Sequence, residues 1–490
     1  MEPPLPETLT VEALLVRIER LDRENVALRE KLAAALAEIE RLRRRGQRQA
    51  TPFSTGTRKE QPRKPGRKPG QGPFTFRAAP AAATVTARLV VPLAATACPA
   101  CGGALLPTEA EVVTVTDLPP QLRPAVTAYH LGCGRCAQCG KRVRAPHPAV
   151  AADQRGATAH RLGLRLMAAA HWLHYGAGVP VRKLPAVLST LTGIRVTQGA
   201  LTQDALRRAA GSVGAAYQTL RQAIPQAAVV YTDDTGWKVG GETAFLMTFT
   251  TPEATVFQIR DRHRNDEVRE LIPSDYAGVM VCDRARSYDA RPLQAVRQQK
   301  CLAHVQRTLS EALADQWGRA RSFPLRLRAL LAQAMALWRR QQEGELTAEQ
   351  FATQRQQLQA AVSEHLRPRR LINPTNRRLL SELGWQHDQG NLLRFLLDPQ
   401  VEPTNNRAER ALRPGVIARK VSQCSKNPAG AAAHAAFVSV VCTLRQRGET
   451  GLIEALVSVF TAGAVRDPPE HSIAAHHCLS AILPVGAVAC

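Results

Sequence analysis

The chain has 490 residues and carries 65 Lys and Arg against 41 Asp and Glu, a formal net charge of +24. This surplus favours a polyanionic partner, either nucleic acid or an anionic membrane surface, and argues against an ordinary metabolic enzyme. Hydrophobic residues make up 44% of the chain, which excludes a wholly disordered protein. No apolar run reaches the roughly 18 residues of a membrane-spanning helix, and the acidic N-terminus does not match a secretory signal.

An apolar heptad repeat runs through residues 11–43. β-Branched residues at a with Leu at d favour a parallel two-stranded coiled coil, whose register a buried Asn25 would fix. Charges at the flanking g and e positions are opposite in sign across such a dimer. We therefore predict a homodimerising zipper over residues 1–45; an amphipathic helix packed on its own domain is the alternative. The a and d positions are Val11, Leu14, Ile18, Leu21, Asn25, Leu28, Leu32, Ala35, Ile39 and Leu42.

The next segment, residues 43–77, contains eleven Lys or Arg and one acidic residue, with Pro and Gly throughout. This composition cannot bury a core, so we expect a flexible basic linker over residues 46–80. Such a linker would attract phosphates regardless of base sequence and could reach into a minor groove. A merely solvated linker is the alternative. The residues expected to bind nucleic acid here are Arg63, Lys64, Arg67 and Lys68.

The eleven Cys are expected in a reducing compartment, where metal binding is more common than disulfides. Two Cys-x-x-Cys pairs, each followed by Gly, are typical of a structural Zn²⁺ site, so we predict a zinc-binding module over residues 81–150. Unligated cysteines are the alternative. Cys133 also forms such a pair with Cys136, but only the pair of Cys136 and Cys139 is followed by Gly-Lys. The expected ligands are Cys98, Cys101, Cys136 and Cys139.

Residues 151–225 are rich in Ala, Leu and Arg, a composition typical of helices. Within them, a helix, a turn at Gly193 and a second helix capped by Thr197 have the outline of a helix-turn-helix. The second helix would bring Arg207 and Arg208 to DNA. Helix pairs joined by a Gly turn are common in α-helical domains, so an ordinary helix pair is an equal alternative.

The pattern then changes to apolar runs that end in acids. One run ends in Asp233 and Asp234 and another in Asp283, and both indicate buried strands. Neighbouring strands that deliver an Asp at the same end place like charges side by side, which is costly unless a cation lies between them. Carboxylate oxygens are the ligands that Mg²⁺ prefers. Glu409, the one acid between residues 403 and 430, offers a third ligand among several cations; a surface ion pair is the alternative.

These acids lie within longer motifs. The motifs are Thr232-Asp233-Asp234-Thr235-Gly236-Trp237, Cys282-Asp283-Arg284-Ala285-Arg286-Ser287-Tyr288, Cys301-Leu302-Ala303-His304, and Pro403 to Arg413 followed by Arg419-Lys420. With the paired Cys motifs, they make the chain resemble the insertion sequence 66 family of DDE transposases. The resemblance runs from the zipper to about residue 460, and its most specific motif is PTNNRAERALRP.

The resemblance implies an RNase H-like catalytic fold whose acidic triad is Asp233, Asp283 and Glu409. These residues would hold two Mg²⁺ (or Mn²⁺) ions, with Asp233 bridging them. The family often has Glu directly after the first Asp, where this chain has Asp234; the motif aligns Asp233 with the catalytic residue. The expected fold is thus multidomain and α-rich, with a mixed α/β core.

In this organisation the zipper, basic linker, zinc-binding module and helical, HTH-like segment precede the catalytic core. The core would occupy residues 226–300 and 401–465, separated by an α-helical insertion at 301–400, and a C-terminal tail would occupy 466–490. Cys301 and His304 resemble a Cys-x-x-His element of related transposases. Two ligands are too few for a metal site, so we expect a buried Cys301 and a His304 near substrate phosphate.

The implied function is a transposase that binds terminal inverted repeats and catalyses Mg²⁺-dependent strand cleavage and strand transfer. The alternatives are a non-catalytic dimeric zinc-containing DNA-binding protein derived from a transposase, and an RNase H-like nuclease. Expected partners are element ends and target DNA, with helper proteins from the same element as candidates. The expected location is the bacterial cytoplasm, at the nucleoid and away from membranes. Beyond the linker, the residues expected to bind DNA are Arg207, Arg208, His304, Asn405, Asn406, Arg410, Arg413, Arg419 and Lys420.

Overall fold

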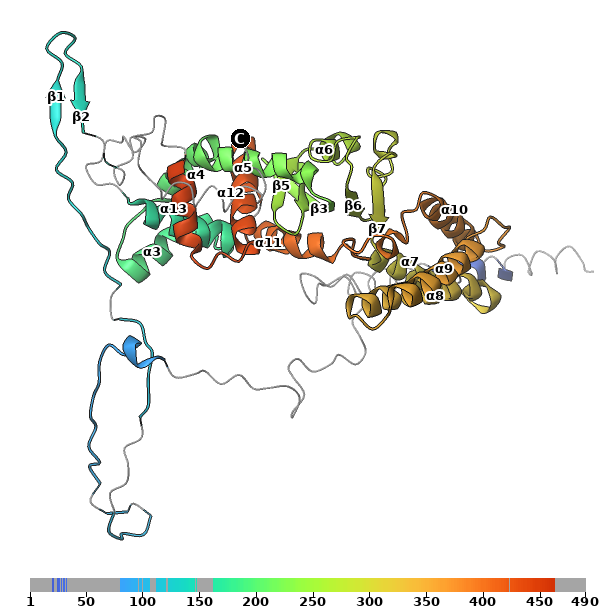
Figure 1. The fold of residues 1–490 in the computed structure, drawn as a ribbon, viewed down its shortest axis with the longest axis horizontal. Coiled ribbons are helices and arrows are strands. Elements are labelled where there is room, and N and C mark those ends of the chain that lie inside the picture. The colour runs from blue at the N-terminus through green and yellow to red at the C-terminus, as the bar shows by residue number, and fades with distance from the viewer. Residues whose placement is uncertain are drawn as a thin grey trace, which may run out of the picture. The chain divides into compact units, whose positions relative to one another are not determined.

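The structure is a computed structural model that divides into two compact units, Met1–Asp117 and Leu118–Cys490 (Figure 1). The basic linker, with its predicted contacts Arg63, Lys64, Arg67 and Lys68, lies outside the described residues, as does the tail 466–490. The residues that the structure describes are 20–21, 24–26, 28, 30, 32, 80–95, 97–98, 100–105, 112–119, 122–145, 147, 162–422 and 424–462.

In the first unit, the described residues between 20 and 32 are helical, and Arg20 forms an ion pair with Glu24 at 3.0 Å. The heptad leucines described there are exposed: Leu21 by 54%, Leu28 by 64% and Leu32 by 60%. The only regular element described after them in this unit is the short 3-10 helix η1, Ala82–Thr84. A helix with exposed leucines at heptad spacing has the surface that a coiled-coil partner would cover.

The second unit starts with a short hairpin and a group of helices. The hairpin pairs β1 (Cys133–Arg135) with β2 (Arg142–Arg144). The helical elements are α2 (Leu164–His171), η2 (Trp172–Gly176), η3 (Val181–Lys183), α3 (Leu184–Thr192), α4 (Gln198–Ala210), α5 (Ser212–Ala223) and η4 (Ile224–Gln226). The predicted turn is present: Gly193 ends α3 with φ 73°, and the Thr197 side chain caps α4 by accepting the Ala200 N–H.

A mixed five-stranded sheet follows, in the order β5-β4-β3-β6-β7. β3, β4 and β5 form an antiparallel meander, whereas β6 and β7 run parallel to β3. Gly240 and Gly241 make the β3–β4 turn with φ of 62° and 96°, a region that Gly enters without a Cβ clash. The strands are β3 (Val229–Val239), β4 (Glu242–Thr250), β5 (Thr255–Arg260), β6 (Val279–Cys282) and β7 (Arg297–Lys300), with α6 (Asn265–Arg269) between β5 and β6.

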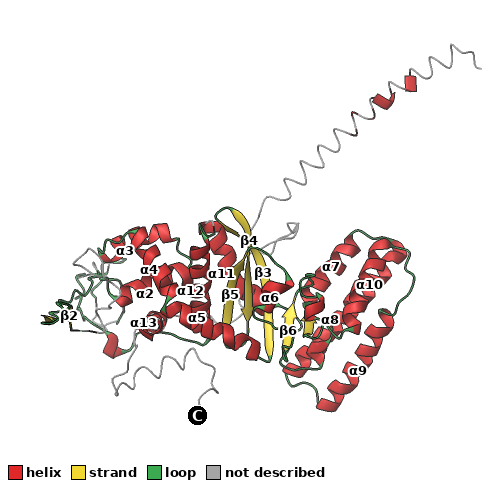
Figure 2. Cartoon of the chain, turned by 90° about the horizontal axis from the view of Figure 1, so that it is seen from above, coloured by secondary structure: helices red, strands yellow, loops and turns green. Residues whose placement is uncertain are grey.

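The helices after β7 form the predicted helical segment between the second and third acids. The Thr347 and Gln350 side chains form the capping box that the sequence predicts at the start of α9. Figure 2 shows these helices grouped at one side of the sheet. They are α7 (Leu302–Ala314), η6 (Gly318–Arg321), α8 (Ser322–Gln342), α9 (Ala348–His365), α10 (Pro374–Asp388) and η7 (Arg394–Leu396).

The chain then returns to the sheet through α11 (Asn406–Ser422), α12 (Pro428–Gln446) and α13 (Leu452–Ala462). Side chains of β3 alternate between two cores, as the strand period requires. Val229 and Tyr231 pack in a core with α7 and Ala408 of α11, whereas Val230 packs in the core that contains α5 and α12. Among the described helices, none combines the length and the apolar composition needed to cross a bilayer.

Candidate active site

Asp233 and Asp283 lie at the same edge of the sheet. β3 and β6 are parallel neighbours in which Tyr231 pairs with Val281. Asp233 lies two residues after Tyr231, and Asp283 lies two residues after Val281. Asp283 comes directly after β6, and its Oδ1 accepts the Ala285 N–H at 2.8 Å. The parallel pairing of two apolar strands therefore places the two acids together, as the sequence predicts.

The carboxyl of Asp233 is crowded by other acids. Burial and the charges of Asp283, Asp234 and Glu409 together raise its pKa to about 7, against a hydrogen bond from the Asp234 backbone that lowers it. Three other carboxylates thus act on one half-buried carboxyl, which favours either its protonation or a cation among the acids. The oxygen-only character of Asp233, Asp283 and Glu409 fits a hard divalent cation such as Mg²⁺.

Asp234 points to the opposite face of β3, since successive strand residues alternate. Its Oδ1 lies 3.3 Å from His263 Nε2, and His263 also lies 3.2 Å from the Ser287 hydroxyl. Burial raises the pKa of Asp234, and His263 opposes that rise. The structure thus gives Asp234 a different partner from Asp233. His263 was not predicted, because a lone His in an Arg-rich turn carries no signal in the sequence.

Glu409 lies in the first turn of α11, and Asn405 fixes where that helix starts. The Asn405 side chain donates to the Thr232 carbonyl at 2.7 Å, and its backbone N–H donates to Cys301 Sγ at 3.2 Å. Asn405 is fully buried, so the prediction that it contacts DNA needs correction. Its amide is committed to β3 because α11 packs its start against that strand, and it positions Glu409 there.

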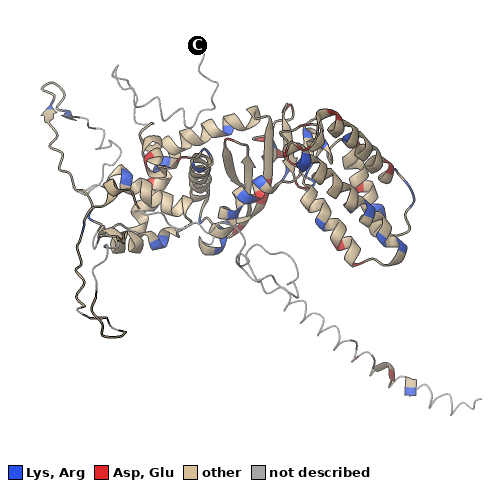
Figure 3. Ribbon diagram, turned by 60° about the horizontal axis from the view of Figure 1, so that its bottom comes forward, with Lys and Arg blue, Asp and Glu red and all other residues tan. Residues whose placement is uncertain are grey.

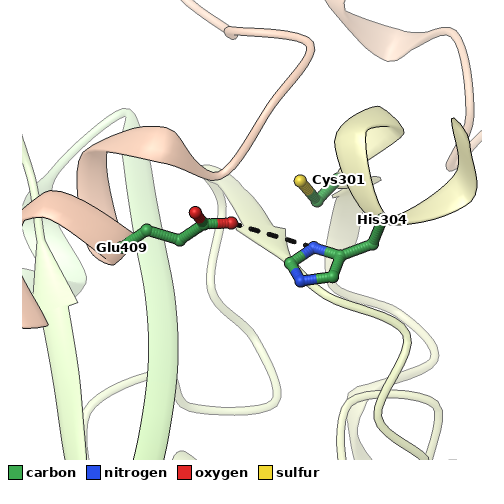
Figure 4. Close-up of side chains that lie close together, drawn as sticks. All are labelled: Cys301, His304 and Glu409. Carbon is green, nitrogen blue, oxygen red and sulfur yellow. Dashed lines mark ion pairs between the residues drawn. The ribbon is translucent and has the colours of Figure 1, made fainter. Parts of the chain in front are cut away.

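Cys301 and His304 lie beside Glu409 (Figure 4). Cys301 is the N-cap of α7 and is fully buried; His304 is in the first turn of that helix. His304 Nδ1 lies 3.9 Å from Glu409 Oε1, and both atoms are buried without a hydrogen-bond partner among the described residues. Burial raises the pKa of Cys301, and backbone N–H groups of Asn405, His304 and Ala303 oppose that rise. His304, predicted as a DNA contact, therefore lies next to Glu409, the acid that the sequence predicts as a third metal ligand.

The predicted DNA contacts on α11 divide into two groups. Figure 3 shows Lys and Arg spread over the helices of the second unit, and α11 contributes exposed ones at helical spacing. Arg419 is half-buried and donates to the Thr235 hydroxyl at 3.0 Å, so it ties α11 to β3. The opposite side of α11 is buried through Ala408, Leu412 and Gly415. The exposed face of α11 is made by Asn406, Arg410, Arg413 and Lys420.

Arg208 requires a correction. Its side chain is only 5% exposed, and Nε donates to Asp204 at 2.8 Å while the guanidinium lies 3.9 Å from the centre of the Phe460 ring. Asp204 also pairs with buried His171 at 2.8 Å, so Arg208 belongs to a buried charge cluster. The helical period turns this residue toward the core, whereas Arg207 remains partly exposed and pairs with Asp204.

The two Cys pairs have the same local geometry, each within its own unit. Cys98 and Cys136 each donate a backbone N–H to the carbonyl five residues on and accept one from the Gly four residues on. Those glycines, Gly102 and Gly140, have φ of 72° and 67°. Backbone N–H groups lower the pKa of Cys98 and Cys136. Cys133 lies in β1 instead, opposite Arg144, so the Gly-containing turn belongs to the preferred pair.

Comparison with known families gives one result. Residues 160–433, more than half of the chain, match the model of the transposase IS66 family. The matched region contains the whole sheet, the helices between the second and third acids, and all four carboxylates of the candidate site. No curated protein matches the chain.

Proposed function

The chain belongs to the IS66 family of transposases, and we propose that it cleaves DNA at the ends of an insertion sequence and joins them to target DNA in a Mg²⁺-dependent reaction. The observation that carries this proposal is the parallel pairing of β3 and β6, which brings the half-buried Asp233 and Asp283 to one edge of the sheet, close enough to Glu409 for the charges to interact. A cluster of acids within a chain of net charge +24 is a cation site surrounded by phosphate-attracting surface.

The sheet supports an RNase H-like catalytic core. Its first strand, β3, is central, the second and third extend the antiparallel meander to one side, and β6 and β7 add in parallel on the other. Asp233 lies in the central strand β3, and Asp283 directly follows the parallel strand β6. Glu409 comes from α11. This is the arrangement that the family resemblance implies for a two-metal site.

Asp233, Asp283 and Glu409 are the residues that would hold the metal. Mg²⁺ (or Mn²⁺) supplies positive charge that makes a water or 3′-hydroxyl more nucleophilic and stabilises the leaving oxygen. The protein's own contribution is to hold three carboxylates in a fixed, largely buried arrangement through β3, β6 and the Asn405 contact to Thr232. The exposed Arg410 and Arg413 beside Glu409 would bind the DNA backbone.

The remaining parts are proposed to bind DNA and assemble the complex. The exposed start of α4, with Arg207 at its far end, supports a helix-turn-helix contact. The heptad leucines support a dimer, which would bring two element ends together. The turn at each Cys pair is typical of a zinc knuckle, and the proposed ligands of the structural Zn²⁺ are those expected from the sequence, Cys98, Cys101, Cys136 and Cys139.

The test is cleavage of a labelled element-end oligonucleotide, run beside a gel shift at fixed salt. Asp233→Asn, Asp283→Asn and Glu409→Gln should each lower cleavage by orders of magnitude, because each removes a charged ligand, and should leave DNA binding intact. Asp234→Asn is the matched control and should be milder, since Asp234 pairs with His263.

Two outcomes would contradict the proposal. If Glu409→Gln cleaves like the unmodified protein, the third ligand lies elsewhere. If no protein cleaves in Mg²⁺ while all bind the ends, the chain is a DNA-binding protein without catalysis.

A further inference from the structure

Three side chains with different donor atoms converge between α7 and α11. Cys301 Sγ, a ring nitrogen of His304 and a Glu409 carboxylate oxygen all lie within 4.8 Å of one another. Figure 4 shows the thiol, the imidazole and the carboxylate directed toward a common point. Cys301 and His304 come from one end of α7, whereas Glu409 comes from a segment more than a hundred residues away.

Two of these donor atoms lack any other partner among the described residues. His304 Nδ1 and Glu409 Oε1 are buried and have no hydrogen-bond partner, and the 3.9 Å between them is within ion-pair range but too long for a hydrogen bond. Leaving both atoms unpaired is costly. Their separation is close to the about 3.4 Å expected for two ligands of one tetrahedral ion with bonds of about 2.1 Å.

Backbone donors around the Cys301 sulfur would offset part of the cost of burying a metal-bound thiolate. Its Sγ accepts the Asn405 backbone N–H at 3.2 Å and lies at the N-terminal end of α7, where backbone N–H groups favour negative charge. Because Asn405 also donates to Thr232, the same residue holds the sulfur and the start of the Glu409 helix in place. Such contacts orient ligands in metal sites.

We propose that Cys301, His304 and Glu409 bind a borderline-soft divalent ion, with Zn²⁺ the best match. Thiolate and imidazole donors select Zn²⁺ over Mg²⁺, and three protein ligands leave a fourth position open. This site shares no ligand with the proposed Cys-only site of the paired motifs. It does share Glu409 with the proposed catalytic triad.

The shared ligand gives this site a regulatory consequence, which rests on the proposed function. Zn²⁺ held by Cys301 and His304 would draw Glu409 away from Asp233 and Asp283. Micromolar Zn²⁺ should then inhibit Mg²⁺-dependent cleavage, and Cys301→Ala should be less sensitive to that inhibition.

The direct test counts bound zinc and needs no activity. The full-length protein is stripped with chelator, loaded with ZnCl₂, passed over a desalting column and analysed for metal. Cys301→Ala and His304→Gln should each hold about one equivalent of zinc less than the unmodified chain. His304→Asp, which keeps a ligand, should retain most of it, and Cys442→Ala is the matched cysteine control that should retain all of it.

The thermal unfolding of each variant is measured together with its zinc content, so that loss of zinc through misfolding is distinguished from loss of a ligand. If folded His304→Gln and Cys301→Ala both bind as much zinc as the unmodified protein, the site does not exist. A loss of cleavage activity with the zinc count unchanged in every variant would contradict this inference and leave the proposed function intact. An unmodified chain that binds the extra zinc but never cleaves would support the site and contradict the proposed function.

Discussion

At the scale of single residues, Asp233 carries an electrostatic cost that its proposed role as a metal ligand explains. Its carboxyl is held where burial and Asp283, Asp234 and Glu409 disfavour the charged form. The folded protein therefore binds a proton at Asp233 up to a pH of about 7, whereas the unfolded chain releases it near 3.8. The contribution of this residue to stability is thus greatest below the unfolded pKa and falls as the pH rises from about 4 to about 7.

Because the Asp233 charge is unfavourable in the folded protein, we predict that its removal stabilises the metal-free protein, kept free of metal by a chelator. At pH 8, Asp233→Asn should raise the free energy of unfolding by roughly 1–4 kcal/mol, because one pKa unit corresponds to about 1.4 kcal/mol. The gain should shrink at pH 5, where the folded protein already holds the proton. Urea unfolding at the two pH values measures the difference.

Added Mg²⁺ should reverse this order, so that the unmodified protein becomes more stable than Asp233→Asn. Mg²⁺ should raise the melting temperature of the unmodified protein more than that of Asp233→Asn, because only the former keeps all of its proposed ligands. Asp261→Asn removes a carboxylate whose side chain is 80% exposed and serves as the control. Equal behaviour of the Asp233 and Asp261 variants would show that Asp233 is not under electrostatic strain.

At the scale of elements, α11 combines structural and electrostatic roles on different faces. Ala408 and Leu412 pack toward the sheet, Arg419 bonds to β3, and Glu409 faces the acids. The opposite face presents Arg410 and Arg413 to solvent. A helix arranged in this way positions an acid in the site while its basic face remains available to phosphate.

This division predicts a salt-dependent binding defect. The double substitution of Arg410 and Arg413 by Ala should weaken DNA binding for any base sequence and reduce the slope of log K against log salt by about 2, since each phosphate contact contributes about 0.9. Gel shifts across a salt series give the slope. The double Ala substitution of Arg326 and Arg328, exposed on α8, removes the same charge elsewhere. An identical loss for both pairs would assign the effect to net charge rather than to α11.

At the scale of the whole molecule, the chain separates an N-terminal unit with exposed heptad leucines from a unit that contains the sheet and the candidate site. Transposition joins two element ends, so a dimer would be the functional assembly. Burial of each exposed Leu in a partner helix would contribute about 1.5–3 kcal/mol, enough in sum to hold two chains together.

The zipper therefore predicts a change of mass when one d position is altered. Full-length protein should sediment as a dimer at micromolar concentration, and Leu28→Lys should shift it toward monomer. Val26 is 57% exposed, close to the 64% of Leu28, but lies outside the a and d positions, so Val26→Lys should remain dimeric. Asn25→Ile should make the dimer harder to dissociate. Monomer at every concentration in the unmodified protein would exclude the zipper.

Local patterns in the sequence determined the strands, the helix caps and the order of the acids. The apolar runs before Asp233 and Asp283 specify buried strands because their side chains need a core on both faces. The Thr197 and Thr347 caps follow from bonds within one turn of the chain, which neighbouring residues alone decide. The motif around Glu409 likewise indicated the family, which the match over residues 160–433 confirms.

Only the tertiary structure decided which side chains meet across long separations. Arg and Asn are usually exposed, so the sequence predicts Arg208 and Asn405 at the surface. In the structure, contacts with Phe460 and Thr232 bury them. His263 contacts Asp234 only in the folded chain. Likewise, Cys301 and His304 lie near Glu409 only because α11 packs beside α7 and the sheet. These contacts depend on how segments up to hundreds of residues apart pack, whereas sequence periodicity reports only which face of its own element a residue occupies.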